Sequence, residues 1–327
     1  MTNTILDPSS NGQAEPSTLP RSAALLLATD GTAQSDAAIE LAYLLSLKDQ
    51  SDVTVLTVVD RAPVPWGSVD VSVVLDYERG QLREAQQRVR AQVERLGNNK
   101  WTIEVRNGNP TTTIADLAKE TGARLLVVGL GGHGPAARFF GNETALRLMR
   151  VSRTPVLAVD RTLRALPSRI VVAMDFSESS IKAARLALDI AAPGATLTLV
   201  HVVPWERKEY VPEQWFRDHE SYIDSQLKRV AGWLNHHDRC RIHQRILYGK
   251  PGPSILACAD DLDANLIVAG THGRNLLGRI FGGETVAKLV RGARRSVLVF
   301  PHAAAFEGLD STAHEAHTPE AVPVWSE

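Results

Sequence analysis

Short runs of consecutive apolar residues alternate along this chain with longer segments in which apolar residues recur every three or four positions. Residues 23–28 form an apolar run of strand length, and residues 35–48 follow with Ala38, Leu41 and Leu45 at helical spacing. A run that is apolar on both faces is typical of a strand buried in a parallel sheet. This first pair of segments therefore predicts a buried strand followed by a helix that packs on its sheet.

The same alternation continues through the N-terminal half of the chain. Further strands are predicted at residues 53–59, 101–105, 125–128 and 155–159, and further helices at residues 71–96, 111–121 and 143–151. Strands that alternate with helices need crossover connections, which produce a parallel sheet with helices on both faces. We expect an α/β fold with a five-stranded parallel sheet of order 3-2-1-4-5.

The whole pattern occurs twice. The segment LLLATDGTAQS at residues 25–35 matches IVVAMDFSESS at residues 170–180, so that Asp30 corresponds to Asp175. Later blocks keep the same order, and their offset falls to 141 residues after the long middle helix, as between LLVVGLGG at 125–132 and LIVAGTHG at 266–273. The chain is therefore predicted to hold two tandem copies of one domain.

The segments outside the repeat have a different composition. We expect domains at residues 21–161 and 168–302, joined by a short polar linker at residues 162–167. The two ends, residues 1–20 and 303–327, are rich in Pro, Ser, Thr, Ala and Glu and have few apolar residues. Such segments bury too little apolar surface to fold, so both ends are predicted to be disordered tails.

Composition narrows the class of protein. The chain has 327 residues and a formal net charge of −1, which excludes a strong global field for nucleic acid or an anionic membrane. No apolar run reaches the roughly 18 residues of a membrane span, and the first 20 residues do not resemble a signal peptide. The two cysteines form no CxxC pair and are expected to be reduced thiols. We predict a cytoplasmic protein with neither nucleic-acid nor membrane partners.

Two loops in each copy are placed to hold a ligand, because ligands of doubly wound sheets bind beyond the carboxyl ends of the strands. One loop follows the first strand and carries Asp30 or Asp175. The other follows the fourth strand, at residues 129–142 and 270–283, and leads into a helix whose free N–H groups attract anions.

The second loop of the C-terminal copy has glycines at positions 270, 273 and 283, in the order Gly-x-x-Gly, nine residues, Gly. With this spacing inside a repeated α/β pattern, the chain resembles a tandem universal stress protein over residues 21–161 and 168–301. The resemblance implies two Rossmann-like, nucleotide α-hydrolase-like domains. It also implies a stress-response protein that binds ATP, with or without Mg²⁺, and has no dedicated catalysis.

The resemblance also implies which residues line the nucleotide sites. Asp175, after the first strand, and Val202, after the second strand, match family positions that contact the adenine end. His272 lies inside the Gly loop, where ribose or phosphate contact is open to it. The C-terminal candidates are Asp175, Val202, Gly270, His272, Gly273, Gly283, Glu284 and Thr285. The N-terminal candidates are Asp30, Val58, Gly129, Gly132 and Asn142, in which Asn142 replaces the third glycine and is expected to take its left-handed backbone.

Both copies depart from the family motif at one position. Glu143 and Glu284 stand where nucleotide-binding members have Ser or Thr. A carboxylate 4 Å from a phosphate charge is repelled by about 4 kcal/mol at an effective dielectric of 20. Mg²⁺ or one of the nearby arginines 138, 274 and 279 would have to offset that repulsion.

Two alternative functions stay open. The glutamates complement the helix dipole and so favour an interaction protein whose Gly loops are closed by Glu143 and Glu284. A weak ATP hydrolase is the other alternative, although the sequence has neither a Gly-x-Ser-x-Gly elbow nor a Walker motif, and we predict no catalytic residues. No histidine or cysteine spacing predicts a metal site.

Two structural questions also follow from the sequence. The residues Asp30 and Asp175 are either ligand contacts or helix N-caps, and hydroxyls at positions 32, 35, 177 and 180 are equally good caps. The resemblance implies that the domains pair through their last strands, residues 156–159 and 297–300. In a tandem chain that pairing gives an intramolecular pseudo-dimer, and a further homodimer stays open.

Overall fold

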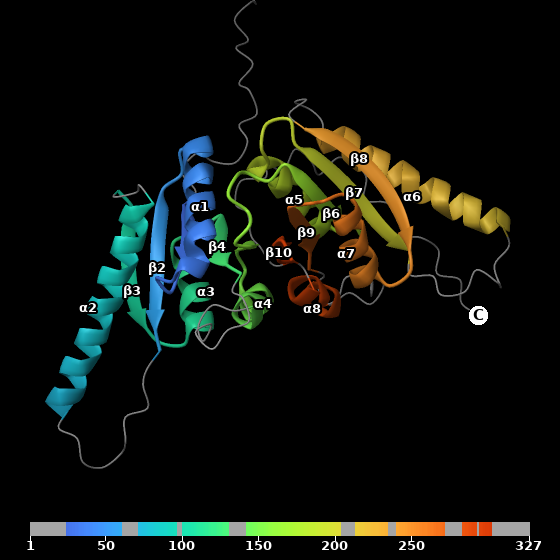
Figure 1. Cartoon of the computed structure of the whole chain (residues 1–327). Coiled ribbons are helices and arrows are strands. Elements are labelled where there is room, and N and C mark those ends of the chain that lie inside the picture. Colours follow the sequence, from blue (N-terminus) through green and yellow to red (C-terminus); the bar gives the residue numbers. More distant parts are fainter. Residues whose placement is uncertain are drawn as a thin grey trace, which may run out of the picture.

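All described strands belong to one ten-stranded sheet (Figure 1). The computed structural model describes residues 24–60, 71–96, 100–130, 142–203, 213–234, 240–271, 283–292 and 294–302. The strand order is β3-β2-β1-β4-β5-β10-β9-β6-β7-β8, which within each half reads 3-2-1-4-5. The strands are β1 (Leu25–Ala28), β2 (Val53–Val59), β3 (Thr102–Asn107), β4 (Leu125–Gly129), β5 (Val156–Val159), β6 (Arg169–Ala173), β7 (Thr196–Val203), β8 (Arg241–Tyr248), β9 (Leu266–Gly270) and β10 (Ser296–Phe300).

The two halves join through their last strands. Every pairing within a half is parallel, whereas β5 and β10 pair antiparallel with Leu157 opposite Leu298. This is the expected pairing of residues 156–159 with residues 297–300. The two predicted five-stranded sheets are therefore halves of one continuous sheet.

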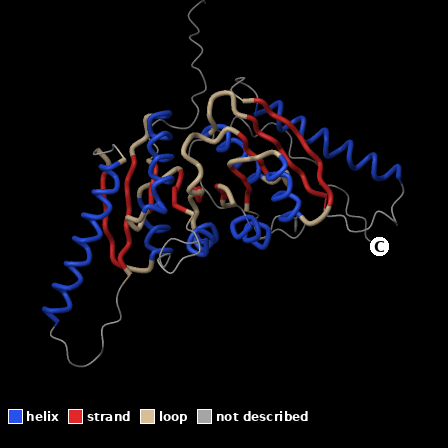
Figure 2. Tube along the Cα trace, in the orientation of Figure 1, coloured by secondary structure: helices blue, strands red, loops and turns tan. Residues whose placement is uncertain are grey.

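Helices cover both faces of this sheet (Figure 2). The helices α1, α2, α5 and α6 share one core cluster with the sheet, and α3, α4, α7 and α8 share the other. A 3₁₀ turn (Ala33–Ser35) precedes α1. The helices are α1 (Asp36–Asp49), α2 (Val71–Arg95), α3 (Pro110–Glu120), α4 (Asn142–Val151), α5 (Glu178–Ile190), α6 (Glu213–Leu234), α7 (Pro251–Asp261) and α8 (Gly283–Gly292).

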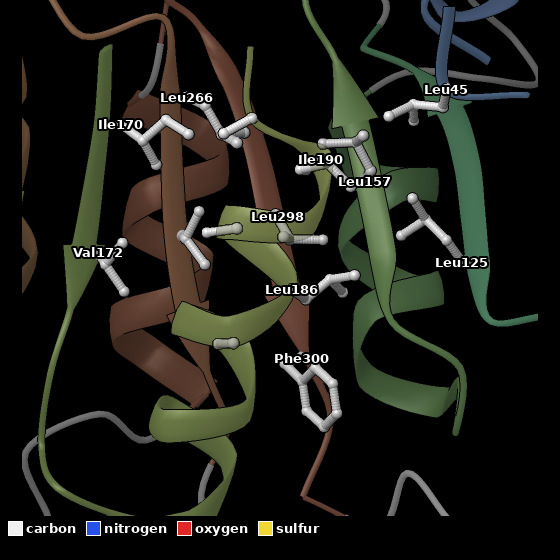
Figure 3. Close-up of a cluster of buried hydrophobic side chains, with 14 of the residues drawn as sticks. Leu45, Leu125, Leu157, Ile170, Val172, Leu186, Ile190, Leu266, Leu298 and Phe300 are labelled. Atoms are coloured by element: carbon white, nitrogen blue, oxygen red, sulfur yellow. The ribbon is translucent and has the colours of Figure 1, made fainter. Parts of the chain in front are cut away.

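The core of each face runs through both halves of the chain. In β1, Leu25 and Leu27 face the α1 side while Leu26 and Ala28 face the α3 side, because side chains alternate along a strand. Leu157 of β5 and Leu298 of β10 both lie in the cluster shown in Figure 3, with Leu186 of α5. The two repeats are therefore packed into one body.

Other contacts hold the halves together at the surface. The Lys48 ammonium of α1 donates to the carbonyls of Asp189 and Ala191 at the end of α5, at 2.7 and 2.5 Å. Lysine is well suited to this position, because the last carbonyls of a helix carry partial negative charge. On the other face of the sheet, the helices α4 and α8 lie beside one another below the joint (Figure 1).

The connection between the domains differs from the predicted polar linker. Leu163 is only 5% exposed and belongs to the core, and its N–H donates to the Asp160 carbonyl. Arg164 pairs with Glu40 of α1 at 2.7 Å. In the segment TLRALP, Leu163 and Pro167 are buried and Leu166 is partly buried, whereas Arg164 is exposed. The two tails predicted to be disordered lie outside the described residues.

Candidate functional site

The aspartate loop and the Gly loop of the C-terminal half begin at one edge of the sheet. Strands β6 and β9 are parallel neighbours, and Ala173 lies opposite Ala269. Asp175 follows β6 and Gly270 ends β9, so both lie at the carboxyl ends of adjacent strands. The same holds in the N-terminal half, where β1 and β4 are neighbours that end before Asp30 and at Gly129.

Gly270 has no room for a side chain. A Cβ there would lie 2.6 Å from the carbonyl carbon of Ser179 and 2.6 Å from the backbone nitrogen of Ser180. The Ser179 hydroxyl also donates to the Thr271 carbonyl at 2.8 Å. Glycine thus lets the first turn of α5 rest directly on the end of β9. For the described residues, this confirms that Asp175 and Gly270 lie at the same edge.

Gly129 ends β4 against the turn before α1 in the same way, but with longer contact distances. A Cβ there would lie 3.2 Å from Cα of Ser35 and 3.3 Å from the Gln34 carbonyl oxygen. Gly132, Gly273 and His272 of the predicted sites lie outside the described residues, so their predicted placement stays a prediction.

Asp175 organises the loop after β6. Its Oδ1 accepts from the backbone N–H of Ser177 at 3.0 Å and from the Ser177 hydroxyl at 2.6 Å. Ser177 is the N-cap of α5 and accepts from the N–H of Ser180 at 3.2 Å. The alternative that Asp175 is itself the N-cap is wrong, because the N-cap is Ser177, two residues later.

Asp30 has the same role in the N-terminal half. Its Oδ1 accepts from the N–H and the hydroxyl of Thr32, at 3.0 and 2.7 Å, and from the Ser35 hydroxyl at 3.4 Å. Neither Thr32 nor Ser35 caps its helix with a side-chain hydrogen bond. Both aspartates therefore shape a loop at the carboxyl edge.

The predicted adenine-contacting valines lie inside strands. Val202 of β7 is fully buried and Val58 of β2 is 6% exposed, and both belong to the core on the α3 and α7 side. The sequence analysis placed Val202 just after its strand, and the structure corrects this, because Val202 lies within β7. Strand β7 reaches Val203 because it pairs with β8 over its whole length.

His201 and Phe176 are residues of this edge that the sequence analysis missed. The His201 ring is 7% exposed and stacks on Phe176, with ring centroids 4.9 Å apart and planes 22° apart. Its Nδ1 lies 2.8 Å from the Met174 carbonyl oxygen. A histidine inside the mostly apolar run LTLVHVV was the available signal.

The N-terminal half closes its aspartate loop with polar side chains of α2. Gln92, 4% exposed, donates to the Thr32 carbonyl at 2.6 Å and to Asp36 at 2.7 Å, and accepts from Thr29 at 3.1 Å. Arg95 contacts both oxygens of Asp36 at 2.9 Å.

The stem of Arg88 also lies over the loop of the N-terminal half. A Cβ on Gly31 would lie 2.7 Å from Cγ of Arg88. The side chains of α2 therefore reach this loop at several points, which the sequence did not indicate.

The two glutamates that replace the Ser or Thr of the family motif both pair with basic side chains of α8. Glu143 contacts Arg291 of α8 at 2.9 Å, which lowers the pKa of the Glu143 carboxyl. Glu284 contacts Lys288 one turn along α8 at 2.8 Å, and Lys288 likewise lowers the Glu284 pKa. The arginines predicted to offset these charges lie outside the described residues. Among the described residues, Lys288 pairs with Glu284 and Arg291 pairs with Glu143.

The first turns of α4 and α8 hold three further predicted residues. Asn142 and Gly283 begin the two helices, and Thr285 is 8% exposed. Asn142 is the first residue of α4, so a helical position replaces the left-handed turn expected from the sequence. Its side-chain oxygen is buried and accepts no hydrogen bond, which leaves one acceptor at this loop unsatisfied.

The described residues contain neither a cluster of metal ligands nor a helix that could span a membrane. Over the residues that the structure covers, no three His, Cys, Asp or Glu side chains gather as metal ligands would. None of the described helices combines the length and apolarity that a bilayer crossing requires.

Comparisons with known proteins agree with the repeat. The family model described as the universal stress protein family matches residues 23–160 and again residues 167–301. A universal stress protein of Mycolicibacterium smegmatis is 25% identical over 287 residues, covering 84% of this chain and 96% of that protein. A universal stress protein of Mycobacterium tuberculosis is 25% identical over 286 residues, covering 81% and 94%.

Two solved structures share the fold. The structure of a universal stress protein from Archaeoglobus fulgidus has a TM-score of 0.58 at 21% identity, covering 84% of this chain and 95% of that one. A structure titled as a putative universal stress protein from Pseudomonas aeruginosa has a TM-score of 0.51 at 18% identity, covering 86% and 93%. At these identities the likeness concerns the fold.

Proposed function

This chain belongs to the universal stress protein family, and from that premise we propose that its C-terminal half binds an adenine nucleotide without dedicated catalysis. The site lies at the carboxyl edge of β6 and β9, between Asp175 and the first turn of α8. The protein acts in the cytoplasm as a stress-response protein whose partner is ATP, with or without Mg²⁺.

One observation carries this proposal. Glycine at position 270 lets the turn that holds Asp175 and Ser177 rest on the strand from which the Gly loop starts. A carboxylate with an ordered acceptor geometry and a loop with phosphate-binding spacing are thus joined at one edge. Adenine offers an amino donor to a carboxylate, and phosphate oxygens accept from the N–H groups at a helix start.

The charge of Glu284 is compatible with this site. Its side chain is 82% exposed and its carboxylate is paired with the ammonium of Lys288. A neutralised pair repels a phosphate much less than a lone carboxylate does. The pairing therefore supports nucleotide binding over the alternative in which Glu284 itself closes the Gly loop.

The N-terminal half is the weaker nucleotide site. Asn142 replaces the glycine found at position 283, and the Arg88 stem covers Gly31 beside Asp30. The polar network of Gln92 also ties the aspartate loop to α2. We therefore assign the principal site to the C-terminal half.

Calorimetric titration of ATP and adenosine against the intact chain tests the proposal. Glu284→Ser should tighten ATP more than adenosine, because only ATP carries the charge that the carboxylate repels. Lys288→Gln should weaken ATP more than adenosine, since it leaves Glu284 without its partner. Asp224→Ser, which removes an equivalent pair with Lys228 on α6, is the matched control and should change neither affinity.

The outcomes separate the candidate functions. Equal ATP affinities for the native chain and Glu284→Ser would show that Glu284 only stabilises the helix start. Failure of every variant to bind ATP or adenosine would refute the proposal and favour an interaction protein. Release of phosphate from bound ATP above a no-protein control would make the protein a weak hydrolase.

A further inference from the structure

His201 of β7 is a buried imidazole at the carboxyl edge of the sheet. It is 7% exposed, and its Nδ1 lies 2.8 Å from the Met174 carbonyl oxygen. A carbonyl oxygen only accepts, so Nδ1 must carry the hydrogen. The free ring position is therefore Nε2, and a second proton taken up there would put a full charge at a site with little solvent.

The imidazole supports a strained residue. Phe176 has φ of 63°, in the left-handed region that bulky residues rarely adopt. Its ring stacks on His201 at 4.9 Å, and the chain on either side of it is Asp175 and Ser177. Strain of this kind persists only where surrounding contacts fix it. The ring stack is such a contact, so His201 helps to hold the turn that presents Asp175.

The N-terminal half has the same turn without this arrangement. Gly31 stands at the position of Phe176, with φ of 77°, and glycine adopts that conformation without strain. Thr57 stands at the position of His201 and carries no titratable group. The device is therefore confined to the half that we assign as the principal site.

The charges around His201 come from three sides. Asp175 in the loop after β6 attracts a proton to the imidazole, and His219 of α6 opposes it. Next to His219, Glu220 interacts with Tyr248 of β8. On α5, Glu178 is paired with Lys182. Among these influences burial is the largest, and it lowers the pKa of His201 below its ordinary value of 6.5.

We propose that His201 and Phe176 form a proton-operated latch on the Asp175 loop of the C-terminal half. Neutral His201 holds the stack and the turn, whereas protonated His201 leaves the stack for solvent and releases Phe176. As a regulator of nucleotide affinity the latch rests on the proposed function. The conformational change of the Asp175 loop does not depend on the proposed function.

The direction of the pH effect follows from the lowered pKa. The latched conformation favours neutral His201, so its stabilising contribution is complete above pH 6.5. Below that pH the released conformation binds the proton better, and the latch weakens as pH falls toward the lowered pKa. A single proton changes the ratio of the two conformations by at most about tenfold per pH unit.

A pH titration of the intact chain by NMR tests the latch without any nucleotide. The expected result is that the His201 ring titrates below its ordinary range and that the amide signals of Asp175, Phe176 and Ser177 shift with the same midpoint. His201→Thr, which copies the residue of the N-terminal half, should abolish those amide shifts. Loop amides that stay still while His201 titrates would overturn the proposal.

Adenosine binding then tests the regulatory part, because adenosine has no phosphate that titrates between pH 5.5 and 7.5. Its affinity should fall severalfold from pH 7.5 to pH 5.5 in the native chain and not in His201→Thr. Phe176→Gly, which fits the left-handed backbone, should also lose the pH dependence. His243→Gln, an exposed histidine of β8, is the control and should keep it.

The two tests fail separately. If neither ATP nor adenosine binds at pH 7.5, the proposed function is contradicted, while the NMR titration still decides the latch. If adenosine binds equally at both pH values in the native chain, the latch does not regulate the site.

Discussion

Gly270 is the residue at which the two candidate loops meet. Its sequence neighbours form a buried strand, and its own lack of a side chain admits the backbone of Ser179 and Ser180. Because those contacts are with main-chain atoms of a helix start, they cannot move aside as a flexible side chain would. A substitution at position 270 therefore tests how closely α5 packs against the end of β9.

Gly270→Ala is expected to destabilise the protein. Overpacking typically costs about 1–3 kcal/mol, and the rigid backbone places this case at the upper end. Urea denaturation measures the change. Gly232→Ala is the matched control, because nothing lies within 4 Å of its added Cβ in α6, and it should stabilise by up to about 1 kcal/mol. An unchanged unfolding midpoint for Gly270→Ala would contradict the close packing.

The long helices α2 and α6 contact their aspartate loops and sheets in different ways in the two copies. When the two helices are aligned by their buried residues, Val89 and Val93 of α2 correspond to Leu227 and Ala231 of α6. Gln92 then corresponds to the apolar Val230. The N-terminal half thus fixes its loop to the helix through buried hydrogen bonds, whereas the C-terminal half uses apolar contacts and the Phe176 ring stack.

Gln92→Leu is expected to cost about 1–3 kcal/mol of stability, because it leaves the Thr32 carbonyl and part of Asp36 without a buried donor. The measurement is chemical denaturation of the intact chain. Gln87→Leu, on the exposed face of the same helix, should stay within about 0.5 kcal/mol. A loss as small as the control's would mean that the network does not secure the loop.

At the scale of the whole molecule, the two repeats are packed into one body. The pairing of β5 with β10 makes the sheet continuous, and each core cluster contains side chains from both halves. An exposed edge strand is prone to pair with other chains, and this joint covers the two last strands inside one chain. The joint therefore leaves β3 and β8 as the two outer strands of the described sheet.

Leu157→Ala and Leu298→Ala each remove a fully buried leucine at this joint and should cost about 2–5 kcal/mol. Because the two residues face each other across the antiparallel pair, the double variant should lose less than the sum of the two single losses. Denaturation should remain one transition. Two separate transitions would show that the halves fold independently.

The sequence by itself determined the architecture. Apolar runs such as residues 25–28 and 125–128 are buried on both faces, and that burial requires helices above and below a parallel sheet. The repeat then set the number of domains, and the spacing of the glycines indicated the family. These features are local or periodic, so they can be read along the chain.

Only the tertiary structure decided which side chains meet at the site. Arg291 beside Glu143, Gln92 beneath the Asp30 loop and His201 under Phe176 are contacts whose partners depend on helix rotation and strand register. Val202 was misplaced for the same reason, because its burial depends on how far β7 pairs with β8. Side-chain partners come from packing, and packing is a property of the folded body rather than of any single segment.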